Sequence, residues 1–388
     1  MRRLALVVIL CCFWFVVSWG CSGETDPIDP STTSTSGSGA GSYDGGPHDG
    51  SDDAPVDSGP PVDGGQTPVY IGLTPNAVGP DGGTPTAADI AMAELTALAA
   101  GVRAVVVDLP WAELDPNDLS ALTARVDSHR ERGQEVVLAL LVVDGNVAHR
   151  PPALDGLAWD DPAVQLAMDS LLDGIVTVLG DKLHGLVIGR QADTYLSFHS
   201  AEAAALQTFI TLALTHLKQT SPDLLRAAGL SFVGLESPPS YQTLASLGSC
   251  LALVYFPGLG EAPLPADTSP AKDLDEMIEL AADRPILLQA VALGTAATLG
   301  SSDEAQLLFF EAFFAALEPR RASFPVINVH QLHDLVGAAC DAQVVAQGYS
   351  PGDPFADYLC TSGLRVDPQS PKAAWYGFLE ASAQFATP

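Results

Sequence analysis

The sequence predicts a single (β/α)8 barrel, a closed ring of eight parallel strands with helices on its outside. From Pro68 onward, short β-rich runs alternate with Ala- and Leu-rich stretches of helical spacing. The β-rich runs are continuously apolar, which indicates burial on both faces, as in a parallel sheet covered by helices. Eight such units in about 320 residues fit one barrel, which typically needs about 250 residues plus insertions.

The expected strands lie at residues 69–73, 102–109, 135–143, 184–189, 225–235, 251–256, 285–293 and 324–332. The expected helices lie at 86–100, 117–132, 162–179, 201–219, 272–282 and 303–317. Capping residues support two of these helices. Ser302 precedes one, with Asp303 and Glu304 in its first turn, and Asp161-Pro162 opens another, with proline at the first helical position.

The competing fold is a doubly wound open sheet. Such sheets usually contain fewer strands and often carry a Gly-rich turn after the first strand. No Gly-x-Gly-x-x-Gly pattern follows residues 69–73. The barrel is therefore favoured, and we predict that residues 68–388 form it.

Residues 1–20 have the pattern of a targeting segment, two arginines followed by an apolar run at 4–17. Gly20 followed directly by Cys21 resembles a bacterial lipoprotein signal, in which the cysteine is lipidated and becomes the new N-terminus. The Ser-Trp before Gly20 departs from that pattern, and an ordinary secretory signal or an uncleaved anchor is the alternative. The apolar run is shorter than the about 20 residues of a spanning helix, which favours cleavage.

Residues 21–67 are predicted to be a disordered tether. The segment is rich in Ser, Thr, Gly, Pro and Asp, and residues 22–67 contain nine acidic residues and no Lys or Arg. Such a composition cannot bury a core. A lipid on Cys21 would hold the barrel at the cell envelope, and Ser22 after it is compatible with sorting to an outer membrane or the cell surface.

The charge of the chain restricts its partners. It has 47 acidic and 17 basic residues, a formal net charge of −30. Nucleic-acid binding needs clusters of Lys and Arg, so we expect no nucleic-acid partner. His330 and His333 lack the i, i+4 spacing of a metal pair on a helix, and we expect no metal and no cofactor.

The cysteines of the predicted barrel divide into two kinds. Cys250 lies in an apolar run and is expected to be a buried core thiol. Cys340 and Cys360 lie in one polar segment of a chain with an export signal. We expect them to form a disulfide, because exported proteins retain such bonds.

Polar and aromatic residues gather at the predicted carboxyl ends of the strands, where the active sites of such barrels lie. Aromatic rings can cover the apolar faces of a sugar, while amides and carboxylates bind its hydroxyls. The open alternatives are Trp111 as a cap of the barrel mouth and Tyr255 as a core residue. The predicted ligand-binding residues are Asp108, Trp111, Arg190, Gln191, Asp193, Tyr195, Tyr255, Gln289 and His330.

Several segments resemble strand ends and a helix start of retaining (β/α)8 glycosidases, the clan that contains cellulases and galactanases. Residues 189–193, Gly-Arg-Gln-Ala-Asp, match Gly-Asn-Glu-x-Asp, and 255–257, Tyr-Phe-Pro, match Tyr-Tyr-Pro. Residues 289–295 match Gln-Glu-Val-Gly-Tyr-Pro-Ser, and 302–306 match the following Ser-x-Glu-x-Gln. The resemblance extends over residues 68–388, with recognisable motifs at the fourth, sixth, seventh and eighth expected strands.

The resemblance implies two catalytic carboxyl groups, which retaining glycosidases hold about 5–5.5 Å apart. The acid would fall at Gln191 and the nucleophile at Ala290. Arg190 stands where an asparagine usually binds the sugar 2-hydroxyl, and a shift of one residue would put Gln289 in the nucleophile position. None of these side chains can perform the reaction.

We therefore expect an envelope-anchored pseudoenzyme that binds an oligo- or polysaccharide. Two alternatives remain open. One is a scaffold or adhesion protein whose cleft is incidental. The other is an active hydrolase with relocated carboxylates, foremost Asp193 and Glu236. The carboxylates near expected strand ends are Asp108, Asp144, Asp193, Glu236 and Asp334.

Overall fold

A computed structural model describes residues 68–79, 82–232, 239–259, 263 and 268–386. The expectations for the targeting segment, for lipidation of Cys21 and for the tether at 21–67 concern residues outside this described part. Glu236 also lies outside it.

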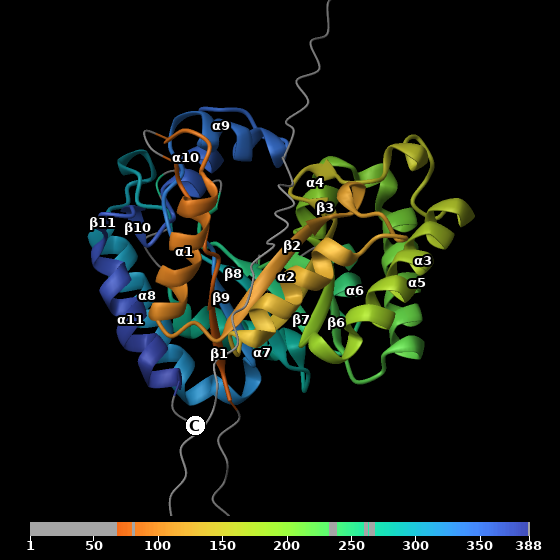
Figure 1. Cartoon of the computed structure of the whole chain (residues 1–388), viewed down its shortest axis with the longest axis horizontal. Coiled ribbons are helices and arrows are strands. Elements are labelled where there is room, and N and C mark those ends of the chain that lie inside the picture. The colour runs from red at the N-terminus through yellow and green to blue at the C-terminus, as the bar shows by residue number, and fades with distance from the viewer. Residues whose placement is uncertain (1–67, 80–81, 233–238, 260–262, 264–267, 387–388) are drawn as a thin grey trace, which may run out of the picture. The chain divides into compact units, whose positions relative to one another are not determined.

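Eight parallel strands form a closed barrel, as predicted (Figure 1). The order is β2-β1-β9-β8-β7-β6-β5-β3, and pairing of β2 with β3 closes the ring. A short strand, β4 (Val147–Ala148), adds to β3 in antiparallel orientation. The barrel strands are β1 (Tyr70–Leu73), β2 (Ala104–Pro110), β3 (Glu135–Asp144), β5 (Gly185–Arg190), β6 (Leu225–Ser231), β7 (Leu251–Tyr255), β8 (Ile286–Val291) and β9 (Val326–Val329).

The six predicted helices are present and surround the strands (Figure 1): α1 (Ala87–Ala99), α2 (Ser120–Glu131), α3 (Pro162–Leu179), α5 (Ala203–Thr220), α7 (Pro270–Ala281) and α8 (Asp303–Leu317). Both predicted caps are confirmed. The side chain of Asp161 accepts a hydrogen bond from the Ala163 amide at 2.8 Å, and that of Ser302 accepts one from the Ala305 amide at 3.1 Å.

The structure adds elements that the periodicity did not predict. Short 3-10 turns occur at Trp111–Glu113, Pro152–Leu154, Gly180–Lys182, Ser200–Glu202, Ala297–Leu299 and Glu318–Ser323. The pair β10 (Arg365–Asp367) and β11 (Ser370–Pro371) forms a separate small sheet. The added helices are α4 (Ala192–Phe198), α6 (Pro239–Ala245), α9 (Gly337–Ala346), α10 (Pro354–Cys360) and α11 (Ala373–Ala386).

Two layers of apolar side chains hold the barrel together. On β2, Val105 and Val107 belong to the layer between strands and helices, while Ala104 and Val106 belong to the layer inside the barrel. This alternation is expected because successive side chains of a strand point to opposite faces. The interior layer consists of small and medium side chains: Ala104, Val106, Val137, Ala139, Leu141, Val187, Ala227, Cys250, Ala252, Leu287 and Val326.

The cysteine predictions for the described part are confirmed. Cys250 is fully buried, and burial raises the pKa of its thiol to about 12. A disulfide joins Cys340 to Cys360, whose Cα atoms are 5.5 Å apart. The segment between these cysteines is not a plain polar loop, because it contains most of α9 and of α10.

One helix in the described part, Pro162–Lys182, is long and apolar enough to cross a membrane by length and composition. It contains α3, whose residues Val164, Met168 and Leu172 are fully buried in the barrel core. Its apolar character is therefore explained by packing against the barrel.

Candidate functional site at the carboxyl ends of the strands

An ion-pair cluster occupies the carboxyl ends of β2, β3 and β5. Arg190 donates from Nε and Nη2 to the two carboxylate oxygens of Asp144, at 2.8 and 2.6 Å, and from Nη1 to Asp108 at 2.5 Å. Parallel pairing of β3 with β5 brings Asp144 directly opposite Arg190. Asp144 and Arg190 are buried, whereas 38% of the Asp108 side chain is exposed.

The cluster retains one negative charge. Burial lowers the pKa of the Arg190 guanidinium, but Asp108 and Asp144 more than compensate, and the net effect is a raised pKa. Arg190 is therefore permanently charged and cannot exchange protons. Both oxygens of Asp144 are already bound by the guanidinium, so within this trio the exposed Asp108 carboxylate is the group that can accept a hydrogen bond from a ligand.

Gln191, in the position of the expected acid, occupies a conformation unusual for its residue type. Its φ is 52°, in the left-handed region, between Gly189 at 79° and the start of α4. A non-glycine residue held in this region costs on the order of 1–3 kcal/mol, and such residues cluster at functional sites. The side chain is 3% exposed, and an amide at this position has no proton to donate to a leaving group.

Asp193 follows two residues later and is tied to β6. Its carboxylate accepts hydrogen bonds from the Ser231 amide at 2.7 Å and from the Ser231 hydroxyl. Burial raises the pKa of Asp193 to about 6, although the bonds from Ser231 act in the opposite direction.

Asp334 belongs to a different, structural cluster. It accepts a hydrogen bond from Lys372 Nζ at 2.8 Å, and Lys372 also donates to Thr295 at 3.0 Å. Burial raises the pKa of Asp334 to about 6, while Lys372 lowers it in part. This ion pair connects the end of β9 to the start of α11, so Asp334 is unsuited to act as a relocated catalytic group.

Amide side chains line the barrel interior below the ion-pair cluster. Asn328 Nδ2 donates to the Gln289 carbonyl at 3.0 Å and to Thr74 Oγ1 at 2.9 Å. The Gln289 side chain reaches across toward β6, where a Cβ on Gly229 would lie 2.8 Å from Gln289 Nε2. Within the described residues, both amide atoms of Gln289 and Asn328 Oδ1 are buried without a hydrogen-bond partner. Ala290, beside Gln289, is buried and carries only a methyl group.

His330 lies at the end of β9, edge-on to Phe256, with ring centroids 5.0 Å apart. Burial lowers the pKa of His330 to about 3, and the charge of Arg190 acts in the same direction. The ring is therefore neutral over the physiological range and can donate from one nitrogen while accepting at the other.

The three aromatic residues predicted to contact sugar lie in the core, which corrects that prediction. Trp111 is 2% exposed and stacks on Phe209 at 5.7 Å. Tyr255 is fully buried and donates to Asp273 at 2.6 Å, and Tyr195 is 3% exposed. Their rings belong to the apolar layer between strands and helices, which Tyr255 enters from the end of β7, Trp111 from the turn after β2 and Tyr195 from α4.

The segment 337–360, which we call the strap, crosses from the end of β9 to the end of β3. The Asn146 amide donates to the Gln347 carbonyl at 3.1 Å, in the turn between β3 and β4. Tyr349 stacks on Phe355, with ring centroids 3.9 Å apart. Burial raises the pKa of Tyr349, and the nearby charges of Asp144 and Asp193 raise it further. Figure 1 shows α9 and α10 at the same end of the barrel as α4.

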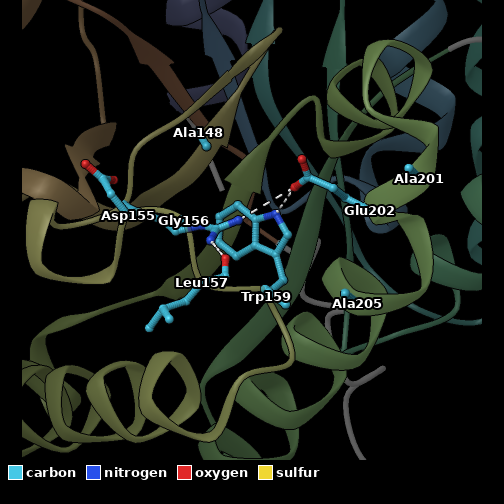
Figure 2. Close-up of a pocket in the computed structure, with 10 residues that line it drawn as sticks. Ala148, Asp155, Gly156, Leu157, Trp159, Ala201, Glu202 and Ala205 are labelled. Atoms are coloured by element: carbon cyan, nitrogen blue, oxygen red, sulfur yellow. Dashed lines mark hydrogen bonds and ion pairs between the residues drawn. The ribbon is translucent and has the colours of Figure 1, made fainter.

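The described part also contains a pocket of about 530 Å³ beside the mouth. It lies between the connection from β4 to α3 and the turn that precedes α5, with Trp159 at its centre (Figure 2). Sequence reasoning did not identify it. The available signal was an Arg-Pro-Pro sequence followed by a lone tryptophan in an irregular stretch, residues 150–159.

No group of three His, Cys, Asp or Glu side chains in the described part is arranged to hold a metal ion. Gln306, from the Ser-x-Glu-x-Gln motif, is fully buried and donates to the carbonyls of Leu293, Ser362 and Gly363 at 2.8–3.3 Å. The motif therefore joins α8 to the chain beyond the seventh barrel strand and has a structural role.

No protein-family model matches the chain, and no curated protein matches its sequence. Solved structures match its fold. A single-residue variant of GH5_18 from Streptomyces cattleya, in complex with Manb1-4GlcNAc, has a TM-score of 0.62 at 17% identity, over 82% of this chain and 81% of that one. A GH5_18 from Bifidobacterium longum subsp. infantis has a TM-score of 0.60 at 15% identity, over 82% and 79%.

An exo-beta-1,4-mannosidase from Opitutaceae bacterium strain TAV5 has a TM-score of 0.58 at 16% identity, over 81% of this chain and 59% of that one. At such low identity the likeness concerns the arrangement of strands and helices. The chain therefore shares with these solved structures the closed (β/α)8 barrel fold.

Proposed function

We propose that this protein binds a glycan without hydrolysing it and is held at the cell envelope by a lipid on Cys21. The main support for a loss of hydrolysis is the ion-pair cluster of Arg190 with Asp108 and Asp144. A retaining mechanism needs an acid and a nucleophile facing each other across the mouth. Here the expected acid is Gln191, and Asp108 and Asp144 are neutralised in part by Arg190.

Two observations support glycan binding. The mouth combines the exposed carboxylate of Asp108 with the neutral ring of His330, groups that can bind hydroxyls. Structures of the same fold were solved with GlcNAc and with Manb1-4GlcNAc. A binding role also agrees with a lipid-anchored chain on a long acidic tether, which would present the barrel away from the membrane surface.

One observation favours hydrolysis as a second candidate function. Asp193 has a pKa raised to about 6 by burial, as general acids in glycosidases require. Its two hydrogen bonds from Ser231 argue against this role, because they hold the carboxylate in its ionised form.

The full-length chain, purified in detergent, tests both functions. We expect retention on a glycan array together with no release of reducing sugar from the glycans that bind. Gln191→Glu alone should remain inactive, because acid and nucleophile act as a unit. Gln191→Glu combined with Gln289→Glu, or with Ala290→Glu, gives two double variants, and one of them should show trace hydrolysis. Successive residues of a strand point to opposite faces, so only one of the two positions can direct a carboxyl across the mouth.

Turnover by the unmodified chain that disappears in Asp193→Asn would establish the hydrolase instead. Absence of binding to every glycan on the array would refute the proposal and favour a scaffold or adhesion role.

A further inference from the structure

The pocket around Trp159 is separate from the Arg190 cluster and is assembled from different segments. Its floor and walls are mostly small or apolar: Ala148, Gly156, Leu157, Ala158, Ala201 and Ala205. Three charged side chains complete it. Arg150 and Glu202 contact Trp159. Asp155 lies on the opposite side of Trp159 from Glu202 (Figure 2). A pocket of this size, largely apolar with a few polar groups, is typical of small-molecule sites.

The guanidinium of Arg150 is held in a fixed position. Its carbon lies 3.7 Å above the Trp159 ring, Nη1 donates to the Leu157 carbonyl, and Nη2 is 3.6 Å from Glu202. Nε is buried and has no acceptor within the described residues. Because Arg150 covers the indole, the pocket has no free aromatic face, and recognition must rely on hydrogen bonds.

The carboxylate of Glu202 is equally well positioned. Its Oε2 accepts from Trp159 Nε1 at 2.7 Å and from the Tyr195 hydroxyl at 2.9 Å. Its Oε1 lies 3.9 Å from His199 Nδ1, too far for a hydrogen bond, and 39% of the side chain is exposed. One oxygen therefore fixes the group, while the other remains able to accept from a ligand.

These charges select the ligand class. Glu202 and Asp155 would repel an anionic ligand. Arg150, 3.6 Å from Glu202, offsets one of these two negative charges, so the pocket has no strong negative field that would select a cation. A hydroxyl group is neutral and can accept from a guanidinium while donating to a carboxylate. A small molecule with several hydroxyl groups therefore fits this pocket. Its hydroxyls can accept from the Arg150 guanidinium and donate to the carboxylates of Glu202 and Asp155.

We propose that this pocket binds one unit of a neutral saccharide, as a second saccharide site beside the barrel mouth. The proposal rests on the proposed glycan-binding function but does not use the mouth. It assigns Glu202 as the positioned acceptor, Arg150 as the donor, and Tyr195 and Trp159 as residues that orient Glu202.

The test uses the full-length chain in detergent and three probes, N-acetylglucosamine, methyl mannoside and methyl glucoside. Saturation-transfer NMR detects contact, and titration gives the affinity. Ala201 is exposed and lines the pocket, whereas Ala204 is exposed on the same stretch and does not line it. Ala201→Trp fills the pocket and should weaken binding at least tenfold, and the matched Ala204→Trp should leave it unchanged.

Glu202→Gln keeps the size of the side chain and should weaken binding severalfold. Circular dichroism of each variant establishes that the barrel is folded. Saccharide binding that survives Ala201→Trp but is lost in Asp108→Trp would overturn the second site and leave the proposed function standing. Binding of none of the probes, or of a simple diamine such as cadaverine instead, would overturn the inference.

Discussion

Replacing Asp144 with asparagine should destabilise the barrel strongly, because it leaves the buried guanidinium of Arg190 without its main partner. Asp144 accepts two of the three hydrogen bonds in the cluster, and its side chain is only 5% exposed. Removing one partner of a buried ion pair costs about 3–5 kcal/mol of the free energy of unfolding. We expect Asp144→Asn to fall in this range.

Asp108→Asn is the matched control. Asp108 contacts the same guanidinium through one hydrogen bond, but 38% of its side chain is exposed. Water can replace the lost bond there, and exposed pairs contribute about 0–1 kcal/mol. The measurement is urea unfolding followed by circular dichroism, with the free-energy change taken from the shift in midpoint at an unchanged slope.

A double variant separates charge from packing. Arg190→Met in the Asp144→Asn background removes the unpaired guanidinium, so it should recover part of the lost stability. Equal losses in Asp144→Asn and Asp108→Asn would refute the reasoning, because burial would then not determine the cost. A double variant less stable than Asp144→Asn would show that Arg190 contributes through packing rather than charge.

Four further predictions concern other parts of the chain. Burial raises the pKa of Asp193, so the folded state binds the Asp193 proton more tightly than the unfolded state, and the free energy of unfolding should fall as the pH rises through about 4 to 6. Thermal unfolding at several pH values should show a flatter profile for Asp193→Asn, and an unchanged profile would contradict the assignment. Mass mapping of unreduced protein should find Cys340 joined to Cys360, and replacing both by alanine should cost about 3 kcal/mol for a loop of separation 20; two free thiols would refute this. Cys21→Ser should move the protein from the detergent phase to the aqueous phase, and continued partitioning into detergent would exclude lipidation. Limited proteolysis should cut within residues 21–67 and leave the barrel as one fragment, whereas resistance of the whole chain would show an ordered tether.

The barrel strands could be predicted because their signal is local. A buried parallel strand must be apolar on both faces, so a run such as 135–143 identifies a strand without reference to the rest of the chain. A helix begins best after a side chain that accepts a hydrogen bond from its first-turn amides, so Asp161 and Ser302 identify two helix starts in the same way. The buried Cys250 was predictable for the same reason, since it lies in an apolar run, whereas the disulfide was predicted from the export signal and the pair of cysteines in one segment. The strap was not, because α9 and α10 lie beyond the last expected strand, where no β-then-α repeat requires a helix.

The site depended on the tertiary structure. The sequence places Asp108, Asp144 and Arg190 at strand ends, but only the register of β2, β3 and β5 brings them into one cluster. It cannot state whether an aromatic residue at a strand end turns inward or outward, and the packing of the helices around the barrel buries Trp111 and Tyr255.

The second pocket illustrates the same limit. Trp159 and Glu202 are 43 residues apart, and they meet only because the barrel brings the ends of β3 and β5 together. The sequence by itself therefore determined the strands and the helices beside them, because these follow from residue type and local pattern. Only the tertiary structure decided which polar groups meet, which are neutralised and which remain able to bind a ligand, because those properties arise from contacts between segments distant in the chain.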